Sequence, residues 1–240
     1  MSSKRGIVLY LHVHQPWRVR EYTVFDTAVN HDYFGECREP HRNNRAIFEK
    51  VADKSYRPMT RLLKQLLDTH PDFKVSLSIS GTMLEQAEVW APDVIDAFRA
   101  LVETGRTEIV ADTYYHSLAF FFSRAEFERQ VALYRAKIRD LFGVETRVFR
   151  NTELSYDNNL AKWADNNGFK GILAEGWDPI LGWRSPNYVY RPINTKHIKL
   201  LMKNYRLSDD IAFRFGNRDW EEFPLRASKY DTWLNNALGS

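Results

Sequence analysis

Two histidines placed two residues apart are the first candidates for chemistry in this chain. His12 and His14 close its first apolar run and are followed by Gln15. On a β-strand this spacing points both side chains to the same side. The pair could hydrogen-bond ligand hydroxyls, or it could supply two ligands of a metal ion that His116 or Asp112 would help to complete. For His12, a core histidine satisfied by backbone groups is a further alternative.

A second cluster of chemically useful residues lies in FRNTELSYDN, residues 149–158. Glu153 follows a short β-rich stretch and is preceded by Arg150, Asn151 and Thr152. A nearby guanidinium and amide donors keep a carboxyl ionised, which suits a nucleophile better than a proton donor. The alternatives are a glutamate stabilised by the dipole of the next helix and an arginine in a structural ion pair.

Polar residues follow short apolar segments repeatedly along the chain. Helical patterns separate these segments, and this alternation predicts an α/β fold with a parallel sheet or barrel whose functional residues gather at one end of the strands. Beyond the first strand, the expected strands are residues 75–80, 108–111, 148–149 and 171–173, and the expected helices are 57–69, 92–103, 123–142 and 156–167.

Three other segments are less regular. Residues 17–54 form a long polar and aromatic connection, which favours an ordered lid. Residues 195–204 are expected to form a strand or a hairpin arm, and residues 225–234 a final amphipathic helix. Without an internal repeat or a recognisable linker, residues 1–240 are predicted to be a single domain.

The composition excludes several classes of function. The 240 residues include 34 Lys and Arg and 31 Asp and Glu without a basic cluster, so nucleic acid is not an expected partner. No segment approaches the roughly 18 apolar residues of a membrane span, and the first residues leave no room for a signal peptide. The single cysteine, Cys37, excludes an internal disulfide and suits a reducing compartment. We therefore expect a cytoplasmic protein without a membrane partner.

Two later segments carry polar groups that could line a ligand cleft. Residues 112–117, DTYYHS, join a strand end to aromatic and polar side chains, although an ordinary polar loop has the same composition. Asp210 follows another acid and could be a general acid or bind a hydroxyl, with Arg214 nearby, but paired acids are more often helix caps. Nucleotide-binding, serine-hydrolase and zinc-protease motifs are absent from the sequence.

Many aromatic residues stand beside polar, glycine or proline residues. Trp17, Tyr115 and Trp177 are of this kind. Flat apolar faces with polar edges suit sugar rings, although core packing is the commoner role of an aromatic side chain.

Four motifs in order resemble glycoside hydrolase family 57. They are HQP at 14–16, GTMLEQ at 81–86, YYHS at 114–117 and FRNTEL at 149–154, and the resemblance continues through AEGWDPILGWRSPNYVYRP and YRLSDDIAFRF. It implies an incomplete (β/α)7 barrel, the N-terminal catalytic domain of α-amylases, branching enzymes and glucanotransferases that act on α-glucans with retention. We expect no cofactor and no metal ion.

The resemblance also assigns roles to residues. Glu153 falls on the nucleophile position, and His14 matches the histidine of the first motif. The remaining site residues are expected to bind substrate: His12, Gln15, Trp17, Glu85, Asp112, Tyr115, His116, Arg150, Trp177, Asp210 and Arg214.

The general acid of this family lies in a motif of the type DYETFG, which is absent here. Truncation at the C-terminal side, with loss of the last strands and a helical region, is the favoured explanation, and it predicts weak or no activity of these residues alone. Loss of the acid, or its replacement by Asp209 or Asp210, is the alternative.

Two other functions stay open. A metal-dependent polysaccharide deacetylase would use His12, His14 and an aspartate around one ion. A non-catalytic glucan-binding protein would keep the aromatic cleft without the acid. The sequence does not separate hydrolysis from transfer.

Overall fold

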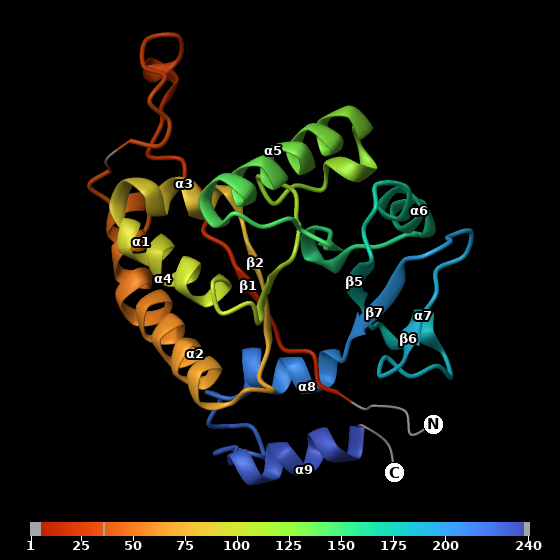
Figure 1. Ribbon diagram of the computed structural model, residues 1–240. Coiled ribbons are helices and arrows are strands. Elements are labelled where there is room, and N and C mark those ends of the chain that lie inside the picture. The colour runs from red at the N-terminus through yellow and green to blue at the C-terminus, as the bar shows by residue number, and fades with distance from the viewer. Residues whose placement is uncertain (1–5, 36, 238–240) are drawn as a thin grey trace. The chain divides into compact units, whose positions relative to one another are not determined.

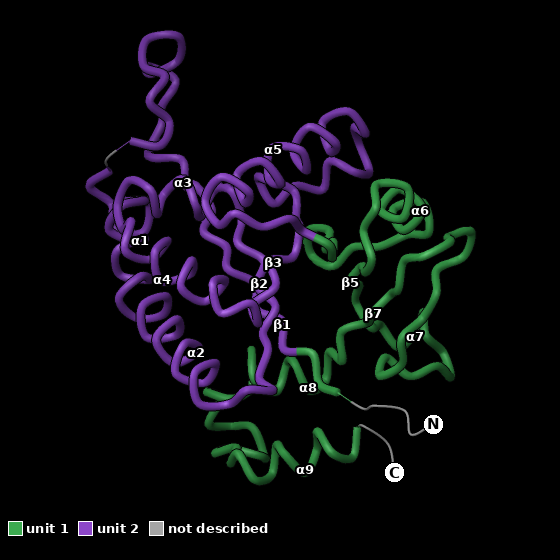
Figure 2. Tube along the Cα trace, viewed as in Figure 1, with its two compact units in different colours: residues 1–8, 147–240 green, residues 9–146 purple. Residues whose placement is uncertain are grey.

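A computed structural model of the protein describes residues 6–35 and 37–237 (Figure 1). The chain divides into two compact units, shown in separate colours in Figure 2. Unit 2 holds residues 9–146, and unit 1 holds residues 1–8 and 147–240. The single domain expected from the sequence stays a prediction.

Unit 2 alternates strands with helices, as the sequence predicts. The segment after the second strand, for which the sequence analysis names no element, is a helix. The elements are β1 Tyr10–Val13, a 3₁₀ turn Val24–Asp26, α1 Asn44–Val51, a π-helical turn Ala52–Tyr56, α2 Arg57–Thr69, β2 Val75–Ile79, α3 Gly81–Trp90, α4 Pro92–Val102, β3 Thr107–Ile109, a 3₁₀ turn Ala119–Phe121 and α5 Arg124–Phe142.

The sheet of unit 2 is parallel, in the order β1-β2-β3. Val13 pairs with Ile79, and Leu77 pairs with Ile109. Parallel strands need a crossover, and helices α1 to α4 supply it. The carboxyl ends of all three strands therefore lie at the same edge of the sheet.

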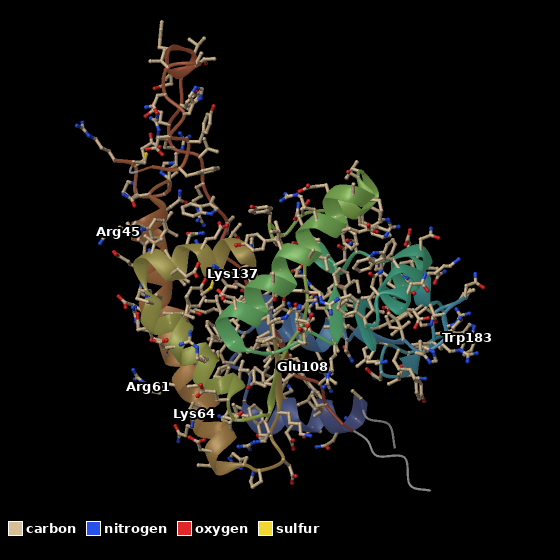
Figure 3. The ribbon with its side chains drawn as sticks, turned by 45° about the horizontal axis from the view of Figure 1, so that its top comes forward. Arg45, Arg61, Lys64, Glu108, Lys137 and Trp183 are labelled. Carbon is tan, nitrogen blue, oxygen red and sulfur yellow. The ribbon has the colours of Figure 1, made fainter. Side chains whose placement is uncertain are left out.

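The helices pack their apolar faces on this sheet. Helix α5 begins where Ser123 accepts a hydrogen bond from the Glu126 amide, and it ends at Gly143, whose φ of 69° is the left-handed conformation that glycine adopts without strain. Lys137 of α5 reaches Glu88 of α3, with Nζ to Oε1 at 2.7 Å (Figure 3). The fully buried side chains include Phe48, Leu67, Leu77, Ile79, Met83, Leu84, Leu101, Phe127, Tyr134 and Ile138.

The connection between β1 and α1 projects from its unit (Figure 1). Hydrogen bonds within it, such as Arg20 N to Tyr33 O at 2.9 Å, hold its two arms together. Its base is tied down because Asn44 donates to the Arg18 carbonyl and accepts from the Arg18 amide. The connection has ordered internal contacts, as the prediction of an ordered lid requires. Its projecting arms, however, do not fold back over the strands of unit 2 as a lid would.

Unit 1 contains a second sheet, in the order β4-β5-β7-β6. Strands β4, β5 and β7 are parallel, whereas the short β6, which the sequence did not predict, is antiparallel to β7. The strand expected within residues 195–204 is β7. The elements are β4 Val148–Arg150, a 3₁₀ turn Thr152–Leu154, α6 Asn158–Asn166, β5 Gly171–Glu175, α7 Asp178–Leu181, β6 Val189–Tyr190, β7 Lys199–Lys203, α8 Tyr205–Asp209, a π-helical turn Asp210–Arg214 and α9 Ala227–Ala237.

Asp165 at the end of α6 fixes the chain before β7. Its carboxylate accepts hydrogen bonds from the amides of Lys196, His197 and Ile198 at 2.6 to 3.0 Å. These amide bonds hold the pKa of Asp165 below its usual range. Among residues 6–35 and 37–237, every helix is too short or too polar to cross a lipid bilayer.

Candidate active site

The carboxyl ends of β1, β2 and β3 bring three polar side chains into register. The ladder between β1 and β2 continues past the strands, because Ser80 N donates to Val13 O at 2.9 Å. If the register is continued by one residue past Val13 and Ile79 and by three residues past Leu77 and Ile109, His14, Ser80 and Asp112 lie side by side. His14 Nδ1 accordingly lies 2.8 Å from Ser80 Oγ. The expectation that polar groups meet at this edge holds within unit 2.

Three histidine rings gather at this edge. The ring centroids of His12 and His14 are 5.7 Å apart with a stacked arrangement, so both rings lie on one side, as their spacing predicts. His116 joins them, with centroid distances of 4.8 Å to His12 and 4.3 Å to His14. His116 Nδ1 lies 3.4 Å from Oδ2 of the fully buried Asp112.

The loop that carries His116 is held in one conformation by its own hydrogen bonds. Thr113 Oγ1 accepts from the Ser117 amide at 2.7 Å, and Gln130 of α5 accepts from the Tyr115 amide at 3.2 Å. His116 itself has a φ of 55°, which a residue with a Cβ rarely adopts. Such strain persists only where the surroundings fix it, and it is commonest at functional sites.

A second group of predicted residues packs beside α3. Trp17 Nε1 donates to Glu85 Oε2 at 3.2 Å, and the buried Gln15 receives a hydrogen bond on its carbonyl from Gln86. A Cβ at Gly81, the first residue of α3, would overlap the Tyr114 ring. The GTMLEQ motif therefore contacts both Trp17, at the base of the projecting connection, and Tyr114 of the DTYYHS loop.

Glu153 stands on a strained turn in unit 1. Its φ is 56°, and the next residue, Leu154, repeats this value. The turn follows the buried Arg150 at the end of β4, and Ser155 closes it by donating to the Thr152 carbonyl at 2.5 Å. Two successive residues with a Cβ in the left-handed region cost about 1–2 kcal/mol each, and here they present an exposed carboxylate.

The helix-dipole alternative for Glu153 does not fit this geometry. Helix α6 begins at Asn158, and its N-cap is Asp157, whose Oδ1 accepts from the Leu160 amide at 2.7 Å. Glu153 precedes that cap on a separate turn. The sequence placed the start of this helix two residues too early.

The strain at Glu153 can be measured by comparing two variants that both lack the carboxylate. Glu153→Gly should be more stable than Glu153→Ala by about 0.5–1 kcal/mol, because only the alanine keeps a Cβ at positive φ. Urea unfolding of the two proteins measures the difference. An alanine variant at least as stable as the glycine variant would contradict the strain.

The other predicted residues of unit 1 lie in separate places. Arg214 Nη1 donates to Oδ1 of the buried Asp210 at 2.6 Å across the π-helical turn, so these two form an ion pair. Asp210 is not the N-cap of α8, since Asn204 has that role and Asp210 directly follows the last residue of this helix. Trp177 is exposed just before α7.

A polar cavity of about 250 Å³ lies next to α7 and α8. Asp178 lines this cavity and accepts hydrogen bonds from the Tyr205 hydroxyl and the Arg206 guanidinium. Both bonds lower the pKa of Asp178, and the bond from Tyr205 has the larger effect. Trp183 follows α7 and is 89% exposed, projecting into solvent (Figure 3). The sequence analysis did not single out this cavity, whose polar residues are spread over three segments.

The structure therefore assembles the predicted residues in groups within each unit. Unit 2 gathers His12, His14, His116 and Asp112 and pairs Trp17 with Glu85. Unit 1 places Glu153 on the turn that follows Arg150, the last residue of β4. The sequence analysis did not identify Ser80 and Gln86, whose side chains hydrogen-bond His14 and the Gln15 backbone carbonyl. Ser80 lies at the end of a predicted strand and Gln86 lies in the GTMLEQ motif, so both stand in segments that the analysis had marked.

A family comparison decides the assignment of the chain. The model of glycosyl hydrolase family 57 matches residues 8–238. The chain belongs to this family. The resemblance of the four motifs to family 57 is thereby confirmed.

Relatives in family 57 extend beyond the length of this chain. A Methanocaldococcus jannaschii protein named "Putative alpha-amylase" is 43% identical over 234 residues, which are 97% of this chain and 49% of that protein. The chain thus spans about half the length of this curated relative.

Solved structures share the fold. The 4-α-glucanotransferase of Thermococcus litoralis matches with a TM-score of 0.68 at 20% identity, over 96% of this chain and 30% of that one. The family 57 branching enzyme of Thermococcus kodakaraensis matches with a TM-score of 0.62 at 11% identity, over 85% and 48%. These likenesses support an α/β fold of the family 57 type.

Proposed function

We propose that this chain contributes the nucleophile of a retaining glycoside hydrolase or glucanotransferase that acts on α-glucans. The observation that carries the proposal is Glu153, an exposed carboxylate on a strained turn after β4 in a family 57 chain. Backbone strain at a residue with an exposed carboxylate is expected where the function requires that carboxylate to point in one direction. Family membership favours this function over the polysaccharide deacetylase interpretation.

In this mechanism Glu153 attacks the anomeric carbon of an α-glucoside. The bond from that carbon to the leaving oxygen breaks, the leaving oxygen takes a proton from a general acid, and a β-glucosyl-enzyme forms. Water or a sugar hydroxyl, deprotonated by the conjugate base of that acid, then attacks the carbon and restores the α configuration. Water gives hydrolysis and a sugar hydroxyl gives transfer. By resemblance to the family, the acid is an aspartate on a later strand.

Other predicted residues would bind the sugar. The histidine group and Asp112 offer hydrogen bonds to hydroxyls, and exposed aromatic faces offer stacking surfaces. The proposed substrate-binding residues are His12, His14, Gln15, Trp17, Glu85, Asp112, Tyr115, His116, Arg150, Trp177, Asp210 and Arg214.

The test is to trap the glycosyl-enzyme. Incubation with 5-fluoro-α-glucosyl fluoride should add the mass of one 5-fluoroglucosyl group to the chain, and peptide mapping should place it on Glu153, because the anomeric fluoride leaves without protonation. Glu153→Gln should show no adduct, whereas Glu128→Ala, which removes an exposed glutamate of α5, should label like the parent. An adduct that persists in Glu153→Gln would contradict the proposal. Glucan binding without any adduct would favour the non-catalytic glucan-binding protein.

A further inference from the structure

We infer that the polar cavity beside α7 and α8 binds one uncharged sugar ring, a glucosyl unit of an α-glucan. The choice of an α-glucan as the source of the sugar rests on the proposed function, whereas the sugar site itself rests on the cavity. The residues that line it belong to unit 1 and are distinct from the histidine group and the Glu153 turn. They are Asp178, Pro186, Asn187, Asn204, Tyr205 and Arg206.

Asp178 and Arg206 keep hydrogen-bonding groups for a ligand after their own contacts are made. Asp178 Oδ2 accepts from the Tyr205 hydroxyl at 2.8 Å and from Arg206 Nη2 at 2.7 Å. Within residues 6–35 and 37–237, Asp178 Oδ1 accepts no hydrogen bond and Arg206 Nη1 donates none. The side chain of Asp178 is 44% exposed and that of Arg206 is 72% exposed, so a ligand can reach both.

An acceptor beside a donor matches two neighbouring hydroxyls of a sugar. One hydroxyl would donate to Asp178 Oδ1 while the next accepts from Arg206 Nη1, and hydrogen bonds to charged groups are the stronger kind. The charges of the cavity cancel, because Asp178 and Arg206 are paired and the other lining residues are neutral. An anion would meet the carboxylate and a cation would meet the guanidinium, so an uncharged ligand fits best.

The size and apolar surface of the cavity suit a single sugar ring. Its volume of about 250 Å³ is below the roughly 300–1,000 Å³ of pockets that enclose drug-sized ligands. Pro186 and the Tyr205 ring line the same cavity and offer apolar surface to the C–H face of a sugar. Trp183 and Tyr188, on the loop that supplies Pro186, are 89% and 70% exposed, so this loop also presents aromatic faces on which a further sugar of the chain can stack.

Hydrogen bonds within unit 1 fix the walls of the cavity before a ligand enters. Asn204 caps α8 by accepting from the Leu207 amide at 3.1 Å, and its Nδ2 donates to Asn187 Oδ1 at 3.0 Å. Asn187 in turn donates to the Ala237 carbonyl at the end of α9 at 2.9 Å. A site whose groups are already held in place loses less conformational entropy on binding.

Sugar titration of the full chain followed by NMR tests the site. In isotope-labelled Glu153→Gln, which the proposed function makes inactive, maltose should shift the side-chain amide signals of Asn187 and Asn204 and saturate as one site. Inorganic phosphate and Ca²⁺ should leave these signals in place. Asp178→Asn and Arg206→Gln should each weaken maltose binding by about 10-fold or more, because each removes a hydrogen bond to a charged group.

Two exposed residues of unit 1 provide matched controls. Asp219→Asn and Arg218→Gln make the same chemical changes outside the cavity and should bind maltose like the parent. Absence of a saturable maltose shift, saturable shifts with phosphate or Ca²⁺, or equal maltose affinity in the folded cavity variants and the controls would overturn the inference.

The trapping experiment decides the proposed function separately. An adduct on Glu153 without maltose shifts at the cavity would support that function and overturn this inference. Maltose shifts at the cavity without an adduct on Glu153 would refute the nucleophile and leave the sugar site standing.

Discussion

Replacing Glu153 with alanine is expected to lower glucosyl transfer from α-glucosyl fluoride by about 1,000-fold or more, and added azide is expected to restore it. The variant loses the attacking carboxylate but gains the space in which a small anion can attack the same carbon. Because azide then attacks from the side where Glu153 stood, the product should be β-glucosyl azide. Proton NMR of the product measures its anomeric configuration.

Two companion variants separate this outcome from a general loss of structure. Glu153→Gln fills the same volume and should be inactive without rescue by azide, whereas Glu128→Ala should keep the parent rate. An α-configured azide product, or a Glu153→Ala rate equal to that of the parent, would refute the assignment of Glu153 as nucleophile. Fluoride as the leaving group keeps the result independent of the general acid.

The second large effect is expected in the core of unit 2. Tyr134 of α5 is fully buried, donates to the Val110 carbonyl at 3.0 Å and accepts from the Ile79 amide at 3.4 Å. Burial raises the pKa of its hydroxyl far above the usual range, so it remains a donor. Tyr134→Ala should lower the free energy of unfolding by about 3–5 kcal/mol, and Tyr134→Phe by about 1–3 kcal/mol. Urea denaturation measures both.

Hydrogen exchange would locate the effect. In Tyr134→Phe, the amides of β2 and β3 should exchange faster, while those of β5 in unit 1 should change less. Tyr188→Phe, at an exposed tyrosine, should leave stability within about 0.5 kcal/mol of the parent. Equal stability of Tyr134→Phe and Tyr188→Phe would show that the buried hydroxyl contributes nothing to the fold.

Much of the fold could be predicted because local signals agree with the final packing. The apolar strands stop at polar residues, and α5 has a serine cap at one end and Gly143 at the other. Where signals were weak, prediction failed: α3 follows Ser80 without a connecting loop, and its largely apolar sequence has no polar face to mark a helix. The antiparallel β6 has two residues, too few for a periodic pattern.

The candidate site was predictable in its residue types but not in its geometry. The spacing of His12 and His14 predicts one shared side, and the structure agrees. His116 approaches His12 and His14 because its backbone adopts a left-handed conformation, which a histidine in the sequence does not predict. Hydrogen bonds from residues distant in the sequence impose this conformation. The same holds for Glu153, because glutamate gives no local signal for a positive φ.

The shared register of β1, β2 and β3 also sets which changes of length the chain can accept. A single residue inserted into one of these strands would turn its later side chains to the opposite face and separate His14, Ser80 and Asp112. The projecting connection before α1 carries no such constraint, since lengthening a loop costs little free energy. Among related chains, insertions and deletions should therefore collect in that connection and be absent from residues 10–14, 75–80 and 107–112.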